Sequence, residues 1–98
     1  MMVTLSDVQK KRTQILKIAA AHGADHVRVF GSVVRGEAGP DSDLDILVHF
    51  SENTSLIDHI ALMQDLETML GVKVDVVEDE ALHPLIRDQV LSEGVALE

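Results

Sequence analysis

The stretch GSVVRGEAGPDSDLD, residues 31–45, decides how this chain folds. It follows the apolar run VRVF at 27–30 and leads into a second apolar run, ILVHF at 46–50. Short apolar runs bounded by Gly, Pro and Asp are typical of strands. Because the connection between the runs is too short for the crossover that a parallel pair needs, we expect the two strands to be antiparallel.

Two carboxylates, Asp43 and Asp45, stand one residue apart at the head of the second strand. Side chains alternate along a strand, so both should point to the same face of the sheet. Neighbouring anions disfavour each other's ionisation unless a cation lies between them. Oxygen ligands in this arrangement suit Mg²⁺, which leaves its other positions to water and substrate phosphates. Solvated carboxylates at a strand start are the alternative, but two acids after a Gly-Ser loop favour a metal site.

Gly31 and Ser32, at the start of the same stretch, supply a complementary feature. Glycine lets the backbone approach a ligand closely, and a short helix that follows would direct free N–H groups toward a phosphate. Ser32 could equally be the N-cap of that helix, and this role is compatible with phosphate binding because both use the same N–H groups. A metal site and a phosphate site joined by one loop indicate chemistry on a nucleoside triphosphate.

These motifs carry a family resemblance. Gly31-Ser32, ten intervening residues and then Asp43-Leu44-Asp45 is similar to the signature of the minimal nucleotidyltransferases, a branch of the DNA polymerase β-like nucleotidyltransferase superfamily. The pairs Arg35-Gly36 and Ser42-Asp43 match as well, and the resemblance extends over essentially the whole chain. Members of this family occur as the antitoxin of HEPN/MNT toxin–antitoxin modules. The resemblance also places a third carboxylate at Asp75.

Hydrophobic periodicity predicts seven elements in the order α-β-α-β-α-β-α. The first helix should begin at a capping box of Ser6 and Gln9 and end at Gly23. This order predicts an α/β (α+β) fold in which helices flank a small mixed β-sheet, and the resemblance implies the polymerase β-like nucleotidyltransferase fold. The remaining elements are strands at 26–30, 43–50 and 72–77, a helical turn at 32–36, and helices at 55–70 and from Pro84 to Gly94.

The composition limits the classes of protein to consider. The 98 residues contain no repeat and should form one domain, 1–98. No apolar run approaches the ~20 residues that span a membrane, and the chain has neither a signal-peptide pattern nor a cysteine, which fits a cytoplasmic protein. The net charge is −9 and the eight Lys and Arg residues form no stripe, so direct nucleic-acid binding is not expected. An acidic surface could instead steer the chain toward a basic protein partner.

Asp75 interrupts the apolar strand at 72–77 and has two interpretations. It could be an edge-strand acid that pairs with Lys73, which shares its face of the sheet. Asp is among the poorest strand formers, however, and its place between two valines suggests a buried carboxylate whose burial must be compensated. With the resemblance added, we favour a third carboxylate in the same layer as Asp43 and Asp45.

Three further polar residues lie in or just after these motifs: Arg35, Ser42 and His49. Arg35 could bind triphosphate oxygens, or it could pair with Glu37, Asp41 or a site carboxylate, since a guanidinium suits either partner. Ser42 is expected to orient the loop or an aspartate through a hydrogen bond. His49 shares the strand face of the aspartates but lies roughly 13 Å beyond the second of them, too far to bind the same metal.

The resemblance implies metal-dependent nucleotidyl transfer, in which the NMP part of an NTP, assigned as ATP, is added to an acceptor hydroxyl. Asp43 and Asp45 would hold two Mg²⁺ ions, with Mn²⁺ as an alternative metal, and Asp75 would act as a metal ligand, the general base or both. The loop would fix the β and γ phosphates so that the α-phosphorus is in line for attack. The candidate nucleotide-binding residues are Gly31, Ser32, Arg35 and Ser42.

The acceptor that the resemblance implies is a protein. Larger members of the superfamily carry extra domains that bind the acceptor, whereas this chain stops after one catalytic core. We therefore expect a hetero-oligomer with a HEPN-type helical protein, a toxin encoded beside it, in which AMP is added to a tyrosine. The alternative is a non-catalytic antitoxin or scaffold that neutralises its partner by binding alone. Three acids in one cleft argue against it, because their repulsion would destabilise a chain that binds no metal.

Overall fold

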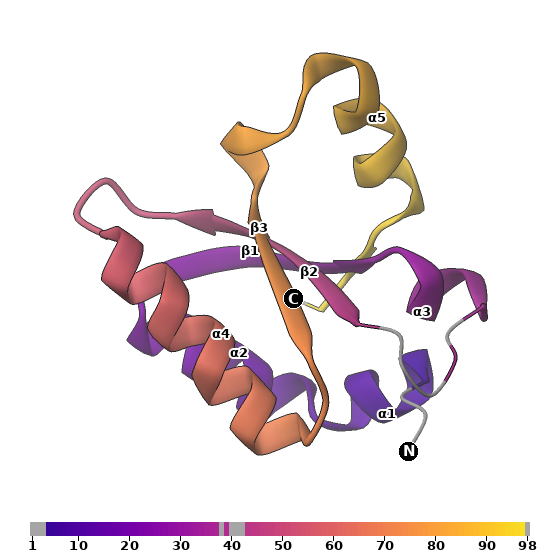
Figure 1. The fold of residues 1–98 in the computed structure, drawn as a ribbon, viewed down its shortest axis with the longest axis horizontal. Helices are drawn as coiled ribbons and strands as arrows, with labels where there is room; N and C mark the ends of the chain where they lie inside the picture. The colour runs from indigo at the N-terminus through magenta and orange to yellow at the C-terminus, as the bar shows by residue number, and fades with distance from the viewer. Residues whose placement is uncertain (1–3, 38, 40–42, 98) are drawn as a thin grey trace.

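The computed structural model describes residues 4–37, 39 and 43–97, which form a four-stranded sheet with helices packed against it (Figure 1). The predicted α/β (α+β) class is confirmed. The strands are β1 (Ala24–Phe30), β2 (Leu44–Phe50), β3 (Val74–Glu78) and β4 (Val95–Ala96). The helices are α1 (Leu5–Lys10), α2 (Arg12–Ala21), α3 (Ser32–Arg35), α4 (Leu56–Leu70), the 3₁₀-helix η1 (Asp79–Ala81) and α5 (Pro84–Glu93).

The strands lie in the order β3-β2-β1-β4 and form a mixed sheet, as predicted. β1 and β2 are antiparallel, which confirms the prediction from the short connection between them. β2 and β3 are parallel, and α4 provides the crossover that a parallel pair needs. The sequence did not predict β4, which pairs with β1, or η1, which follows β3 directly. Both are too short to have a hydrophobic period of their own.

The core lies between the sheet and the helices α2 and α4, which contact each other on one face of it (Figure 1). Alternate residues of β2 face this core: Leu44, Ile46, Val48 and Phe50 are all at most 8% exposed. Leu47 points to the opposite face and is also buried, so that face is covered over part of its length.

The first helix differs from the prediction at its N-terminus. Its N-cap is Thr4, whose hydroxyl accepts a hydrogen bond from the Asp7 N–H at 3.1 Å, and the Asp7 carboxylate accepts one from the Thr4 N–H at 3.1 Å. This reciprocal box leaves Ser6 inside the first turn, so the predicted box of Ser6 and Gln9 is wrong. A carboxylate is the stronger acceptor at a helix N-terminus, where it also meets the helix dipole. The helix is further divided into α1 and α2. α2 ends at Ala21 with His22 as its C-cap, and Gly23, with φ 75°, stops it as predicted.

α4 supports β3 through polar side chains as well as through the core. The Glu67 carboxylate accepts a hydrogen bond from the N–H of Val74 at 3.0 Å. The His59 ring donates from Nε2 to the carbonyl of Val76 at 2.8 Å. These bonds hold β3 on both sides of Asp75.

α5 begins with Pro84 in its first turn and ends before Gly94, as predicted. It differs from α2 and α4 because none of its residues is buried. In Figure 1 it stands apart from those two helices, in the upper part of the view. Within the described ranges, no helix is both long enough and apolar enough to cross a membrane.

Candidate active site

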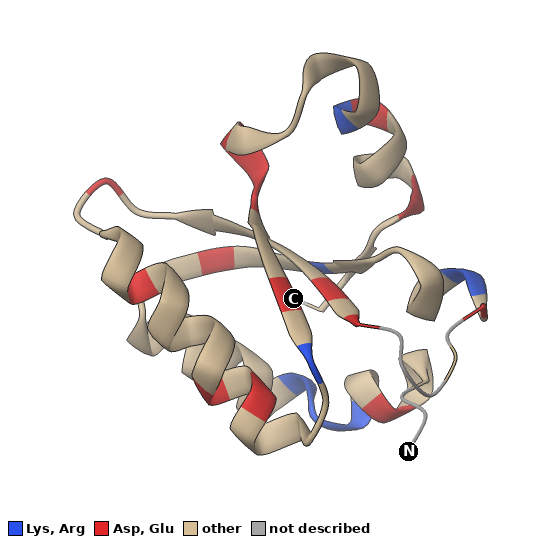
Figure 2. Ribbon diagram, in the orientation of Figure 1, with Lys and Arg blue, Asp and Glu red and all other residues tan. Residues whose placement is uncertain are grey.

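Asp45 and Asp75 occupy neighbouring strands, β2 and β3, and are paired directly in the parallel register. The residues on either side of each acid are buried in the core, so both carboxylates point to the opposite face of the sheet. Asp43 immediately precedes β2 and is exposed. Figure 2 shows acidic positions on adjacent stretches of β2 and β3. The structure therefore brings together the three acids that the sequence singled out.

The three carboxylates interact electrostatically. The pKa of Asp45 is raised, first by partial burial and then by the negative charges of Asp75 and Asp43, while the positive charge of Arg35 opposes the shift. Burial and like charges both disfavour the ionised form of Asp45, and a bound cation would reverse this effect. A set of carboxylate oxygens that repel one another is the donor set that a hard cation such as Mg²⁺ requires.

Asp75 is exposed, so the expectation that its burial must be compensated is wrong. The reason is topological: β3 is the last strand of the sheet, and Asp75 points away from the core. The alternative of a pair with Lys73 is not observed either, because none of the ion pairs among the described residues joins these two side chains. Asp75 is instead accessible to a large molecule that approaches β3.

Gly31 lies against Asp45 because the residue before it, Phe30, pairs with Asp45 in the antiparallel register. Its backbone has φ 79° and ψ −152°, a region that essentially only glycine occupies. A Cβ atom at Gly31 would overlap Oδ2 of Asp45 and would lie 3.1 Å from its Cγ. Glycine is therefore required here by the backbone and by the close approach. Gly31 is also the N-cap of α3, so Ser32 is the first helical residue and not the N-cap.

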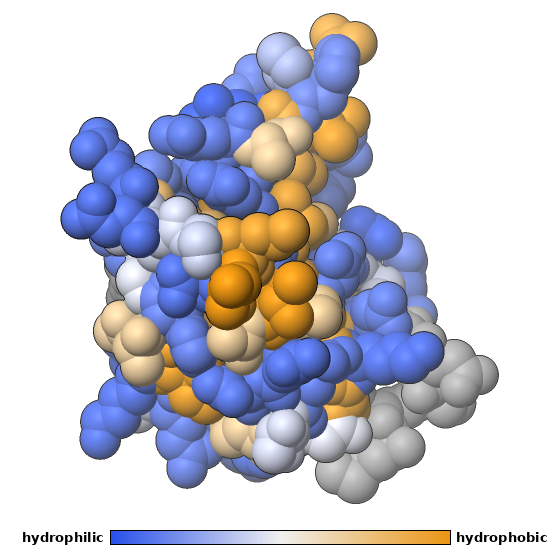
Figure 3. Space-filling view, turned by 60° about the vertical axis from the view of Figure 1, so that its left-hand side comes forward, coloured by the Kyte–Doolittle hydropathy of each residue, from blue (hydrophilic) through white to orange (hydrophobic). Residues whose placement is uncertain are grey.

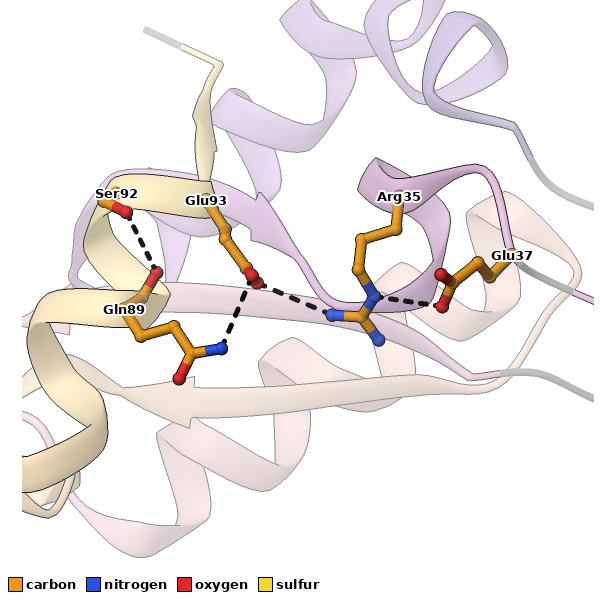
Figure 4. Close-up of polar contacts among 5 residues, drawn as sticks. All are labelled: Arg35, Glu37, Gln89, Ser92 and Glu93. Atoms are coloured by element: carbon orange, nitrogen blue, oxygen red, sulfur yellow. Dashed lines mark hydrogen bonds and ion pairs between the residues drawn. The ribbon is translucent and has the colours of Figure 1, made fainter.

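Arg35, the last residue of α3, is held by two carboxylates (Figure 4). Its Nε donates to Oε2 of Glu37 at 3.1 Å, and one terminal nitrogen lies 3.5 Å from Oε2 of Glu93, at the end of α5. The hydrogen bond to Glu37 is the main reason that the pKa of Arg35 is raised. Pairing with Glu37 was one of the predicted alternatives, whereas Glu93 was not foreseen. Asp41 and Ser42 lie outside the described residues.

A second polar group lies at the other end of β2. Ligand atoms of His49, Asp79 and Glu80 all lie within 4.8 Å of one another, and His49 Nδ1 is 3.1 Å from Oδ1 of Asp79. This hydrogen bond, followed by the charge of Asp79, raises the pKa of His49. The four-residue separation from Asp45 corresponds to about 13 Å along the strand, so the two groups are distinct. This group was not predicted from the sequence, because both acids lie in η1 and that short helix was not predicted.

Comparison with known proteins gives a consistent result. The family described as "Nucleotidyltransferase domain" matches residues 12–97. The chain belongs to this nucleotidyltransferase family. The enzyme is 43% identical over 95 residues to Protein adenylyltransferase MntA of Thermococcus cleftensis, and the alignment covers 96% of each chain. The predicted family resemblance and the enzyme class are thereby confirmed.

Two solved structures resemble this nucleotidyltransferase in fold and sequence. One, described as a minimal nucleotidyltransferase, is 49% identical with a TM-score of 0.85, and 95% of each chain is covered. The other, described as a toxin–antitoxin crystal structure with AMP-PNP, is 26% identical with a TM-score of 0.75. That alignment covers 89% of this chain and 72% of the other. The predicted polymerase β-like nucleotidyltransferase fold is confirmed.

Proposed function

We propose that this nucleotidyltransferase transfers AMP from ATP to a hydroxyl group of a protein partner, a tyrosine of a HEPN-type toxin, and so acts as its antitoxin. The observation that carries the proposal is the convergence of Asp43, Asp45 and Asp75 at one face of the sheet, with Gly31 directly against Asp45. The 43% identical relative, named a protein adenylyltransferase, supports the chemistry. The structure described as a toxin–antitoxin with AMP-PNP supports the adenine nucleotide and a toxin as the partner.

Asp43, Asp45 and Asp75 are the residues that would hold two Mg²⁺ ions, or Mn²⁺ in their place. When bound, these ions neutralise phosphate charge and lower the pKa of the acceptor hydroxyl. The electrostatics of Asp45 support this role, since its partial burial and its two acidic neighbours disfavour an isolated anion there.

We also assign Asp75 the role of general base. Its carboxylate takes the proton of the acceptor hydroxyl while the acceptor oxygen forms a bond to the α-phosphorus. The bond from that phosphorus to the oxygen bridging to the β-phosphate breaks, and pyrophosphate leaves. The exposure of Asp75 supports this assignment, because a protein side chain has to reach the residue that deprotonates it.

Gly31, Ser32 and Arg35 would bind the triphosphate, and Ser42 belongs to the same proposed nucleotide site. The absence of a side chain at Gly31 lets the backbone after β1 lie close to Asp45, so phosphates and carboxylates can share one small volume. Arg35 contributes a positive charge that already acts on Asp45. When a triphosphate binds, Arg35 would replace its hydrogen bond to Glu37 with one to a phosphate, so its guanidinium would be paired with an anion before and after binding.

The experiment that tests the proposal uses the helical HEPN-type protein encoded beside this chain as the acceptor. We expect mass spectrometry to show one or more AMP units on a tyrosine after incubation with ATP and Mg²⁺. A variant with both Asp43→Asn and Asp45→Asn should give no mass gain, although its complex with the partner should still form. If the parent binds and inhibits the partner without ever changing its mass, with any common NTP and with Mn²⁺ as well, neutralisation by binding alone is the correct function.

A further inference from the structure

Helix α5 contributes no buried residue to the hydrophobic core. It has ten residues, none of them buried, and Leu85 and Ile86 in its first turn are 85% and 48% exposed. An isolated helix shorter than about 12–15 residues is marginal in water, and helices in proteins owe most of their stability to a packed apolar face. The apolar side chains of α5 therefore offer a surface that a second molecule can cover.

The surroundings of α5 are acidic. Between Gly36 and Ile86 the sequence contains only one Lys or Arg residue, Lys73. Figure 2 shows acidic positions at the end of β3, in η1 and in α5, with a single basic position on that helix. Such a surface repels nucleic acid and anionic membranes and attracts a basic protein. Between the end of β3 and the end of α5 the acids are Glu78, Asp79, Glu80, Asp88 and Glu93, against Arg87 in α5 and Arg35, which pairs with Glu93.

The far end of α5 reaches the active site. Glu93, its last residue, lies 3.5 Å from the guanidinium of Arg35 and accepts a hydrogen bond from Gln89 at 3.5 Å (Figure 4). In the same helix, the Ser92 hydroxyl donates to the carbonyl of Gln89. The charge of Arg35 acts in turn on Asp45. A molecule bound along α5 would therefore reach Arg35, the residue whose charge acts on Asp45.

We propose that α5 is the docking helix for the acceptor protein. Leu85 and Ile86 insert into an apolar depression of the partner, and Lys or Arg side chains around that depression meet the acids of η1 and α5. The inference rests on the proposed function for the identity of the partner. It adds the surface that presents the acceptor to Asp75.

The other exposed apolar side chains are those of Leu56, Ile57 and Ile60 in the first half of α4, with exposures of 73%, 78% and 42%. Figure 3 shows hydrophobic atoms in the middle of the face that contains α4, and more at the height of α5. α4 differs because Leu62 and Leu66 anchor it in the core. It is stable without a partner, so its exposed residues serve as the matched control.

Affinity is measured with the HEPN-type protein encoded beside this chain, by calorimetry and without nucleotide. Leu85→Ser combined with Ile86→Ser should weaken binding by about tenfold or more, as for the central residues of an interface. Leu56→Ser combined with Ile57→Ser should change affinity by less than about twofold, as for surface positions outside one. The reverse order of effects, equal effects, or no binding by the parent would each overturn the docking role of α5.

Substitution of charged residues tests the docking role of α5 without removing its apolar side chains, so the result does not depend on whether the serine variants fold. Asp88→Asn should weaken binding and Arg87→Gln should strengthen it, because the first removes attraction to a basic partner and the second removes repulsion. The opposite signs would refute a basic partner. AMP transfer is assayed separately: intact binding through α5 without transfer would refute the enzymatic proposal and leave the docking surface standing.

Discussion

Replacement of Gly31 by alanine tests how closely the backbone after β1 is fitted to Asp45. The new Cβ atom has two consequences. It forces an alanine into a backbone conformation, φ 79° and ψ −152°, that L-residues avoid. It also overlaps the carboxylate of Asp45, whose Cγ and Cβ atoms would lie 3.1 and 3.3 Å away.

The size of the effect follows from these two terms. A residue held in a region reserved for glycine costs about 1–3 kcal/mol. An extra methyl group in a filled space costs about 1–3 kcal/mol more. Asp45 can relieve part of the overlap by rotation of its side chain, and this rotation removes the carboxylate from the site. We therefore expect the free energy of unfolding to fall by about 2–4 kcal/mol and nucleotidyl transfer to be lost.

The chain provides a matched control in Gly36. It also has a positive φ, of 72°, but nothing lies within 4 Å of a Cβ atom built there. Gly36→Ala should cost only the backbone term, about 1–2 kcal/mol. Urea denaturation measures both variants, and the difference between them reports the overlap with Asp45 together with the higher backbone cost at Gly31, whose ψ is −152° against 21° at Gly36.

A double-mutant cycle isolates the overlap further. In an Asp45→Ala background, Gly31→Ala no longer meets the carboxyl oxygens, so its cost should drop by about 1 kcal/mol or more, as for residues in contact. An identical cost of Gly31→Ala in the two backgrounds would refute the claim that Gly31 and Asp45 are in contact. Retained transfer activity in the single variant would refute the claim that this contact matters for catalysis.

Three further predictions concern charged groups. Without divalent metal at neutral pH, Asp45→Asn should have a melting temperature equal to or above that of the parent, because the substitution removes a carboxylate that burial and like charges disfavour; a lower melting temperature contradicts this. Asp75→Asn should lower the rate of AMP transfer with little change in ATP affinity, whereas Lys73→Met should leave the rate unchanged; equal, modest effects would favour a structural role for Asp75. The pKa of His49 is raised in the folded state, so its pair with Asp79 stabilises the fold when the histidine is protonated. This stabilisation is complete below the ordinary histidine pKa and is lost as the pH rises through the pKa of His49 in the folded protein. NMR titration should therefore show a lower His49 pKa in Asp79→Asn, and thermal scans should show a larger destabilisation of that variant at pH 5.5 than at pH 8.

Patterns that act over a few residues predicted most of this fold. The short β1–β2 connection and the hydrophobic periodicity of the helix predicted at 55–70 each depend on neighbours in sequence, and each matches the structure. The capping box was misplaced by two residues because Thr4 with Asp7 and Ser6 with Gln9 have the same spacing. Only the better acceptor distinguishes them.

Features that depend on distant segments could not be predicted in the same way. The pairing of Asp45 with Asp75 requires the register between β2 and β3, which no local pattern contains. Asp75 is exposed because its strand, β3, lies at one end of the sheet. Glu93 lies near Arg35 because the chain after β3 brings the end of α5 close to α3. The positions of the acids could be proposed early because the family signature already combines these long-range relations.

The hydrogen bonds from α4 to β3 have a consequence for assembly. The carbonyl of Lys73 accepts from the N–H of Leu44 at 2.9 Å, so the N–H and carbonyl groups of Val74 and Val76 point away from β2. Glu67 and His59 bond two of these groups, the N–H of Val74 and the carbonyl of Val76, as the backbone of a further strand would. The opposite border of the sheet is the two-residue β4. A partner is therefore poorly able to join this protein by adding a strand to its sheet, and copies of the chain are kept from polymerising edge to edge.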